Sequence, residues 1–383
     1  MVASRQCNRP GKLGGRVIQR ASLEDHTVGG GMSKKVQQLS TDNTMVSNHQ
    51  QDVDPDKIID LGTRIPVLRT PIAPELLTEA AHSFPEPYAQ TVREALAEQW
   101  RIPEQHVVCC PSTSESYLAV AEYFRQTSVL LPRPCSSAYE RVTTLCRLRQ
   151  ISFDLRQEED FQFNESQLKN ELSSVALIML GNPHNPTGQC FSRKTLLSLI
   201  DDNPQTCFMI DESDLALVDL DSTNSLVPTI RPNLIVLGTL AESHGWPGLG
   251  PSYLVTGNLD LLAFLSKRFS ATSISGWLQQ IGLELVHQEP TVQREELADL
   301  CQEILPQLQS HSHLKIVPGN APYNLFQITS ELLALLREQC SAKNLTMRWG
   351  EHYLGLADNH LRISLQYREG LQRFFSILKQ LEC

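Results

Sequence analysis

Long apolar runs are missing from this 383-residue sequence, because none approaches the roughly 18 residues that a membrane-spanning helix needs. A basic excess is also missing. The net charge is -10, which argues against nucleic acid as the main partner because nothing offsets its phosphates. The ten cysteines show no CxxC spacing, which favours buried thiols in a reducing cytoplasm over a disulfide or metal framework. With 41% hydrophobic and 20% charged residues, the composition is typical of a globular protein with a substantial core.

The N-terminal region has an unusual charge distribution. Residues 1–23 contain five basic side chains and no acid, which is the charge bias of a targeting peptide. No apolar segment accompanies them, which argues against secretion. A start at Met32 is the alternative explanation. We therefore expect 1–55 to be a disordered or wrongly assigned extension and the protein to be cytoplasmic, with organellar targeting by 1–31 left open.

From about residue 58, short apolar runs alternate with helical patterns. This alternation predicts βαβ units and a mainly parallel sheet, and the unbroken apolar character of the runs predicts helices on both faces. The expected strands are 106–110, 128–131, 151–155, 175–180, 207–210 and 234–238, and the expected helices are 114–125, 138–147, 165–172 and 193–201.

The pattern changes after residue 254. A helical stretch runs over 261–302, with interruptions at 270–275 and 288–290. Short strands at 313–317, 324–328 and 361–365 and helices at 330–343 and 368–381 follow. The fold class is therefore α/β with a smaller α+β domain. We expect a joining segment at 56–85, a large domain at 86–265 and a small domain at 266–383.

The first motif is GNPHNPTG at 181–188, directly after the apolar run VALIML. A loop after a parallel strand lies at the carboxyl edge of the sheet, where α/β proteins place ligands. Prolines and glycines fix the turn and present Asn185 as a hydrogen-bond donor. A rigid turn without a ligand is the alternative.

Two further motifs follow later apolar runs. The run CFMI ends at Asp211, whose carboxylate could hold a protonated ring nitrogen, although helix capping or a solvated acidic turn is the more common role of such a residue. The third motif is the loop TLAESHGWPGLG at 239–250.

In order and spacing, these three motifs resemble the fold-type I pyridoxal-phosphate-dependent aminotransferases. The similarity extends from about Ile58 to the C-terminus, and the branch of histidinol-phosphate aminotransferase and threonine-phosphate decarboxylase matches best. The resemblance implies an aspartate-aminotransferase-like fold, a dimer, and pyridoxal phosphate or pyridoxamine phosphate as cofactor.

Several family residues are present. The resemblance implies that Asn185 contacts the pyridine 3-oxygen, that Asp211 pairs with the ring nitrogen, and that Arg362 grips the substrate carboxylate. It also implies a phosphate cradle at the start of a helix, made of Ser112, Thr113 and Ser114.

Other family positions have changed. Glu242 stands in place of the Schiff-base lysine, Ala241 in place of a phosphate-binding serine, and Gly250 in place of a phosphate-binding arginine. Asp214 replaces a tyrosine or phenylalanine, and Ser136 replaces a stacking aromatic ring. A carboxylate cannot form an imine. Losing two phosphate contacts costs about 1.5–3 kcal/mol each, which weakens binding by roughly 100-fold to 10,000-fold.

Four hypotheses follow from this mixture. The first is a catalytically degenerate, non-catalytic or regulatory homologue, forming a homodimer or a heterodimer with an active homologue. The second is a lysine-independent enzyme acting on an amino acid or amino-acid phosphate, with Glu242 or His244 as base. The third is an ordinary transaminase with the motifs in another register. The fourth is a cofactor-free enzyme in which Glu242, Asp211, Asp214 and His244 form an acid–base or metal cluster. Lys267, in the following helix, is predicted to be solvated and offers no substitute amine.

Overall fold

The computed structural model describes residues 58–218 and 224–381. The expected extension at 1–55 and both possible start sites lie outside these residues. No helix in the described ranges is long and apolar enough to cross a membrane. Cys109 and Cys110 are buried free thiols, as their apolar neighbours predict.

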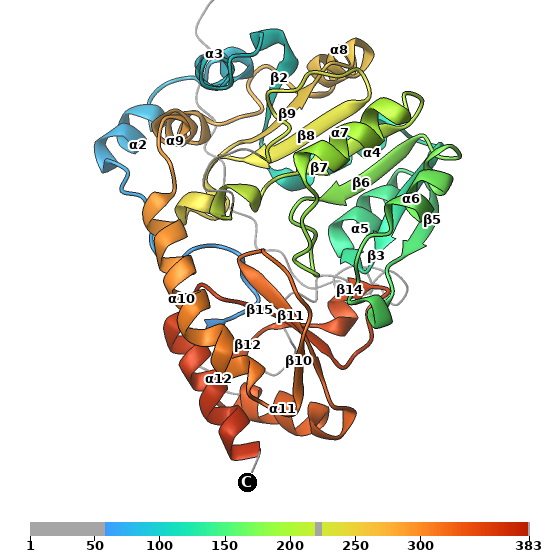
Figure 1. Ribbon diagram of the computed structural model, residues 1–383. Coiled ribbons are helices and arrows are strands. Elements are labelled where there is room, and N and C mark those ends of the chain that lie inside the picture. Colours follow the sequence, from blue (N-terminus) through green and yellow to red (C-terminus); the bar gives the residue numbers. More distant parts are fainter. Residues whose placement is uncertain (1–57, 219–223, 382–383) are drawn as a thin grey trace, which may run out of the picture. The chain divides into compact units, whose positions relative to one another are not determined.

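The large sheet has seven strands in the order β2-β9-β8-β7-β6-β3-β5 (Figure 1). The strands are β2 (Val107–Cys110), β3 (Ser128–Arg133), β5 (Arg149–Asp154), β6 (Leu177–Gly181), β7 (Cys207–Asp211), β8 (Leu234–Thr239) and β9 (Ser252–Thr256). Only β9 runs antiparallel to its two neighbours, so the prediction of a mainly parallel sheet is confirmed.

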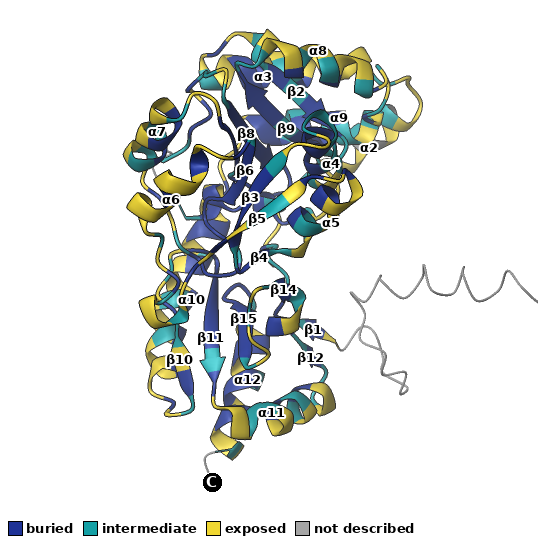
Figure 2. Cartoon of the chain, turned by 90° about the vertical axis from the view of Figure 1, so that its right-hand side faces the viewer, coloured by how far each residue is buried: buried dark blue, intermediate teal, exposed yellow. Residues whose placement is uncertain are grey.

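Both faces of this sheet are buried except at the edge strand β5, because alternate residues of the other strands enter different cores. In β6, Ile178 and Leu180 pack into one core, whereas Leu177 and Met179 pack into the other. The first core is completed by α3 (Gln90–Trp100), α6 (Glu165–Leu172) and α7 (Arg193–Asp202), and the second by α4 (Thr113–Tyr123), α5 (Ser137–Leu145) and α8 (Leu259–Arg268). Figure 2 shows most strands of this sheet in the buried colour, the edge strand β5 largely exposed, and exposed residues on the helices around them. The helices therefore cover both faces, as the apolar runs predict.

A second sheet lies in the C-terminal part, with the order β10-β11-β15-β13 and only antiparallel pairs. Its strands are β10 (Leu314–Ile316), β11 (Tyr323–Ile328), β13 (Arg348–Trp349) and β15 (His360–Ser364). Its core is shared with α10 (Thr291–Gln309), α11 (Ser330–Ala342) and α12 (Arg368–Leu381). The predicted smaller α+β part is therefore confirmed.

The remaining α-helices and strands lie outside these two sheets. They are α2 (Pro74–Ala81), α9 (Gly276–Val286), and the pairs β1 (Ile59–Asp60) with β12 (Leu345–Thr346) and β4 (Cys135–Ser136) with β14 (Tyr353–Leu354). Residues 61–70, which we call the strap, follow β1 without forming a helix or strand. At one end of the strap, the amide of Ser364 in the small sheet donates to the carbonyl oxygen of Leu61. At the other end, the amide of Thr70 donates to the carbonyl oxygen of His244.

Candidate functional site

Three adjacent parallel strands bring the three sequence motifs to one edge of the large sheet. The loop 181–188 begins at the end of β6, Asp211 ends β7, and the loop 239–250 begins at the end of β8. Because β6, β7 and β8 are neighbours in the same direction, their carboxyl ends meet. The sequence argument for a common site is therefore supported by the topology.

Asp211 is held by hydrogen bonds to both carboxylate oxygens. Oδ1 accepts from the amide of Ser213 at 3.0 Å and from its hydroxyl at 2.6 Å. Oδ2 accepts from the hydroxyl of Tyr117 on α4 and, at 3.1 Å, from that of Tyr139 on α5. Burial, together with the carboxylate, raises the pKa of both tyrosines well above the ordinary value. The oxygen available for a ring nitrogen is therefore already in use by two neutral hydroxyls.

Arg362 and Asn185 meet on the side of the site that faces the small sheet. The side chain of Arg362, which is only 2% exposed, donates to Oδ1 of Asn185 at 3.3 Å and to the carbonyl oxygen of Gly62. Its guanidinium lies over the ring of Tyr323, with a carbon-to-centroid distance of 4.6 Å. Its Nε has no hydrogen-bond partner among the described residues. The structure thus brings these two predicted site residues into contact.

Glu242 begins a short 3-10 helix, Glu242–His244, and faces a residue that sequence reasoning missed. Arg64, from the strap, lies with one nitrogen 3.7 Å from Glu242 Oε2. Another nitrogen of Arg64 donates to Oδ2 of Asp214 at 2.5 Å. Tyr323 donates to the same Asp214 oxygen at 3.4 Å. Two of the altered family positions, 242 and 214, therefore share one guanidinium.

The electrostatics of this group favour a protonated arginine beside a less acidic glutamate. Burial raises the pKa of Glu242, with a further increase from Asp214 and Asp211 and an opposing effect of Arg64. Burial lowers the pKa of Arg64, but Asp214 and Glu242 outweigh it, so the guanidinium stays charged. Glu242 Oε2 is buried without a hydrogen-bond partner in the described part of the chain.

His244, the other candidate base, is fixed to the strap. Its Nδ1 lies 2.9 Å from the hydroxyl of Thr70, which also accepts from Gln293 at 3.1 Å. Burial and the nearby charge of Arg294 lower the pKa of His244 to about 4. The ring is therefore neutral near pH 7, and its contacts position the strap.

Within the predicted phosphate cradle, Ser112 caps the helix α4. Ser112 precedes α4, and its hydroxyl oxygen accepts from the amide of Glu115 at 3.2 Å. Thr113 and Ser114 form the first residues of that helix. On the opposite loop, a Cβ atom added to Gly250 would overlap the Cβ of Ala241. The loop has thus closed over the space where a longer side chain at 250 would begin.

The positions at which the resemblance expects a stacking ring and an amine hold other residues. Ser136 caps α5, its hydroxyl oxygen accepting from the amide of Ala138 at 3.4 Å, and supplies no ring. None of the described lysines is buried, and Lys267 is exposed on α8, as predicted.

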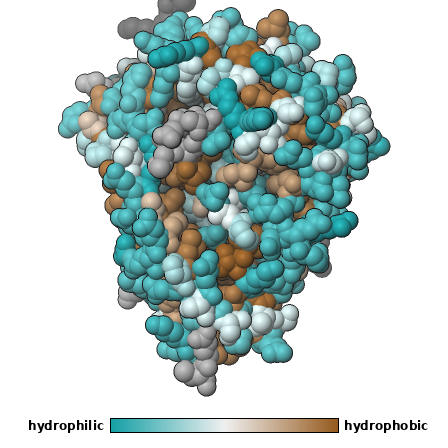
Figure 3. All heavy atoms as spheres, in the orientation of Figure 1, coloured by the Kyte–Doolittle hydropathy of each residue, from teal (hydrophilic) through white to brown (hydrophobic). Residues whose placement is uncertain are grey.

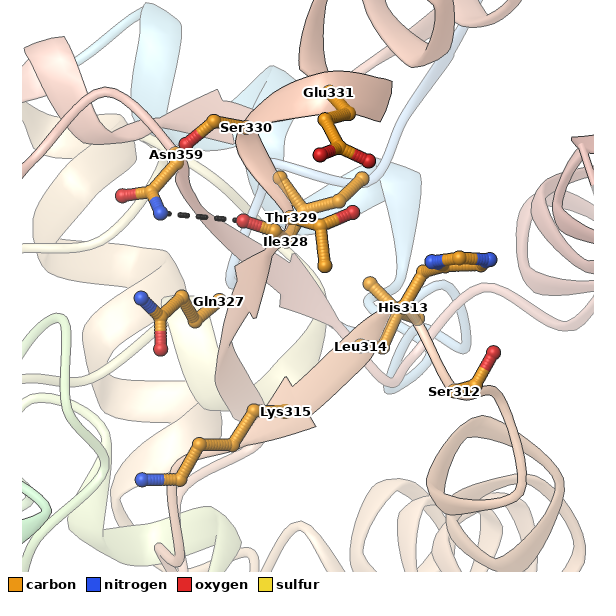
Figure 4. Close-up of a pocket in the computed structure, with 10 residues that line it drawn as sticks. All are labelled: Ser312, His313, Leu314, Lys315, Gln327, Ile328, Thr329, Ser330, Glu331 and Asn359. Atoms are coloured by element: carbon orange, nitrogen blue, oxygen red, sulfur yellow. Dashed lines mark hydrogen bonds between the residues drawn. The ribbon is translucent and has the colours of Figure 1, made fainter.

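A hollow of about 500 Å³ lies elsewhere, on the small sheet. Figure 4 shows Lys315 of β10 and Gln327 of β11 beside each other in its wall, with Asn359 donating to the carbonyl oxygen of Ile328 at 3.2 Å. None of the predicted site residues lines it, so this hollow is separate from the three-loop site.

The model of the family described as "Aminotransferase class I and II" matches residues 56–375, which is most of the chain. The chain belongs to this aminotransferase family. Histidinol-phosphate aminotransferase of Methanocaldococcus jannaschii is 22% identical over 347 residues, covering 86% of this chain and 90% of the relative. The bifunctional adenosylcobalamin biosynthesis protein CobDQ of Leptospira interrogans is 22% identical over 335 residues, covering 82% of this chain. This chain spans only 38% of CobDQ.

Among solved structures, histidinol-phosphate aminotransferase from Clostridium acetobutylicum superposes with a TM-score of 0.76 at 14% identity. The match covers 85% of this chain and 99% of the other. At that identity the likeness shows the aminotransferase fold and nothing more. The predicted fold and family are confirmed, and the family implies pyridoxal phosphate as the cofactor.

Several residues of the aminotransferase-like site were not predicted, among them Arg64, Tyr117 and Tyr139. The two tyrosines lie on helices that approach Asp211 from 94 and 72 residues away in the sequence. Their spacing therefore gives no local signal. Arg64 does carry a signal, because it is a charged residue in an otherwise apolar and small-residue segment, GTRIP, just before the first helix.

Proposed function

We propose that this chain is a catalytically degenerate class I/II aminotransferase homologue with a non-catalytic or regulatory role. The observation that carries the proposal is the position of Glu242. It follows β8 in the loop that carries the Schiff-base lysine in the family, and it faces Arg64 instead of offering an amine. Because no described lysine is buried, no substitute amine is available within those residues.

The residues at the site fit pyridoxal phosphate poorly. Asp211 already accepts hydrogen bonds on both oxygens, so a ring nitrogen would have to displace a tyrosine hydroxyl. The contact between Gly250 and Ala241 leaves no room for a phosphate-binding side chain there. We therefore infer weak or absent binding of pyridoxal phosphate and pyridoxamine phosphate, and no catalytic step is assigned to either.

The second candidate is a lysine-independent enzyme in which Glu242 moves a proton. Its support is the raised pKa of Glu242 and the unpartnered Oε2, which are features of a usable general base. Its substrate would be an amino acid or an amino-acid phosphate. The engagement of His244 with Thr70 makes the histidine the weaker choice of base.

A spectroscopic titration tests the proposal. The purified protein is mixed with pyridoxal phosphate, its aldimine absorption is recorded, and borohydride is added before peptide mapping. An active histidinol-phosphate aminotransferase serves as the positive control. We expect no aldimine band and no lysine trapped at the site, because a carboxylate cannot form an imine.

Calorimetric titration with pyridoxamine phosphate separates the two candidates, because this cofactor form needs no imine. Binding roughly 100-fold or more weaker than in the control enzyme is expected from the two lost phosphate contacts. Binding as tight as in the control would favour the lysine-independent enzyme, and a borohydride-trapped lysine would overturn both.

We also propose a homodimer, or a heterodimer with an active homologue. Figure 3 shows apolar side chains gathered in the middle of one face of the molecule. Among large apolar side chains, Phe84 is 96% exposed and Trp277 is 48% exposed. Burying one such side chain contributes about 1.5–3 kcal/mol. We expect light scattering to give a dimer that Phe84→Glu weakens and that Leu145→Glu, another exposed apolar position, leaves intact. A wild-type monomer at all concentrations, alone and with an active homologue, would contradict the proposal.

A further inference from the structure

Two departures from the family pattern converge on one side chain. Asp214 and Glu242 follow different strands, β7 and β8, yet both carboxylates face the guanidinium of Arg64. Positions that had merely relaxed after losing a function would have no reason to acquire the same partner. Their common contact indicates that the acids serve one purpose.

The group is buried enough for the pairing to matter. The side chain of Asp214 is 7% exposed and that of Arg64 is 26% exposed. Removing one partner of a buried pair is strongly destabilising, because it leaves an uncompensated charge in a poorly solvated place. Glu242 is the weaker partner, since its oxygen lies 3.7 Å away and burial favours its neutral form.

The strap that carries Arg64 lies directly against the altered loop. The indole nitrogen of Trp246 donates to the carbonyl oxygen of Thr70 at 2.7 Å. Gly245 has a φ of +79°, and a Cβ there would overlap the carbonyl oxygen of Leu68. On the other side, Gln366 of the C-terminal part donates to the carbonyl oxygen of Arg64 at 2.7 Å. The strap is thus seated against both the loop 239–250 and the C-terminal part, with its charged residue turned to the acids.

We propose that Arg64, Asp214 and Glu242 form an internal ion-pair lock that holds the strap closed over the former cofactor site. Asp214 is the principal acceptor, and Glu242 supplies a second carboxylate where the family has a cation. The inference rests on the proposed loss of the cofactor, because a cofactor held in the usual way would compete for the same space. The altered positions are then parts of a closure rather than remnants.

Hydrogen exchange in the full chain tests the lock. The amide of Leu61, bonded to the carbonyl oxygen of Thr346, and the amide of Thr70 report on the two ends of the strap. In Arg64→Met and in Asp214→Asn, we expect exchange at Thr70 to be faster by about tenfold or more, as local opening becomes easier. In the double variant, we expect no further increase, because the pair is already broken. Glu242→Gln has a smaller effect.

Two controls keep the test decisive. Arg69→Met removes an exposed cation from the same strap and leaves exchange unchanged, since Arg69 contacts the ring of Trp246 and no acid of the lock. Arg64→Lys keeps the charge, and we expect its exchange rate to lie between those of wild type and Arg64→Met. The lysine variant also replaces Arg64→Met in the test if Arg64→Met does not fold. Unchanged exchange in Arg64→Met, or additive effects of Arg64→Met and Asp214→Asn, would overturn the lock.

The lock and the proposed loss of catalysis fail in different experiments. An aldimine in the wild-type protein would refute the loss of catalysis whatever the strap does. Independent behaviour of Arg64 and Asp214 would refute the lock, even if no cofactor binds.

Discussion

Two loops at the same edge of the large sheet have changed to different degrees. The loop 181–188 matches the pattern that the resemblance expects of an active aminotransferase, and its Asn185 contacts Arg362. The loop 239–250, two strands away, has Glu242 where the resemblance expects an amine, and Ala241 and Gly250 where it expects phosphate-binding side chains. Both loops are nevertheless well packed: His184 in the first and His244 in the second are buried.

The difference teaches that retention of a family residue is weak evidence for retained chemistry. Asn185 and Arg362 hold each other and the strap, and Asp211 holds two tyrosines, so each retained residue also has a structural role here. The loop 239–250 is informative because its residues cannot perform the catalytic roles that the resemblance expects at these positions. The fold alone does not decide whether a retained residue has a catalytic or a structural role.

The largest effect is expected at the retained Asp211. Asp211→Ala leaves the hydroxyls of Tyr117 and Tyr139 without their acceptor. An unsatisfied buried polar group costs about 1–3 kcal/mol, so we expect the free energy of unfolding to fall by about 4 kcal/mol. Chemical denaturation measures it, with Asp211→Asn as the milder control. A loss below about 1 kcal/mol would show that the retained residue has no structural role.

A pH effect is expected at Glu212, which lies between the two loops. Its carboxylate accepts from Ser225 at 2.6 Å and from the amide of Leu226 at 2.7 Å. Burial raises the pKa of Glu212 from 4.5 to about 7, against the effect of these hydrogen bonds. The folded chain therefore keeps this proton in a range where the unfolded chain has lost it, and the contribution of Glu212 to stability falls as pH rises from about 4.5 to about 7.

Glu212→Gln removes this titration. We expect the stability of wild type relative to Glu212→Gln to fall by about 2–3 kcal/mol across that pH range, following the linkage of about 1.4 kcal/mol per pKa unit. Urea denaturation of both proteins at several pH values gives the difference. Parallel stability curves would contradict the assignment.

A smaller effect is expected in the altered loop. Gly250→Arg, which restores the family residue alone, forces the loop away from Ala241. Overpacking of this kind costs about 1–3 kcal/mol, so we expect about 2 kcal/mol of lost stability and no gain in pyridoxal phosphate binding. Thermal denaturation and calorimetry measure the two quantities. Tight binding in this single variant would mean that the loop opens readily and that the site is only dormant.

The smallest effect is expected at Lys267. Because the side chain is exposed on α8, Lys267→Gln should change stability by less than about 0.5 kcal/mol. The same variant checks the site assignment: if borohydride fixes pyridoxal phosphate to wild type but not to Lys267→Gln, the loop 239–250 has been misplaced.

The sequence predicted the elements that repeat a simple pattern. Apolar runs identified β6, β7 and β8, and the turn residues after them located Asn185, Asp211 and Glu242 correctly on one edge. The strand β9 was not predicted, because its short run SYLVT closely follows the Gly- and Pro-rich loop 239–250. Arg64 was not predicted as a site residue because the strap has no periodic sequence pattern. The tyrosine partners of Asp211, Tyr117 and Tyr139, were not predicted because their positions depend on how α4 and α5 pack.

The contact between Gly250 and Ala241 also bears on the route by which such a loop could return to an active form. Each of the two residues fits only because the other is small, so neither can be enlarged alone without a clash. A chain that regained the arginine first would pass through a strained intermediate, and one that enlarged residue 241 first would meet the backbone of Gly250. A return to a larger residue at 250 therefore requires concerted changes at 241 and 250.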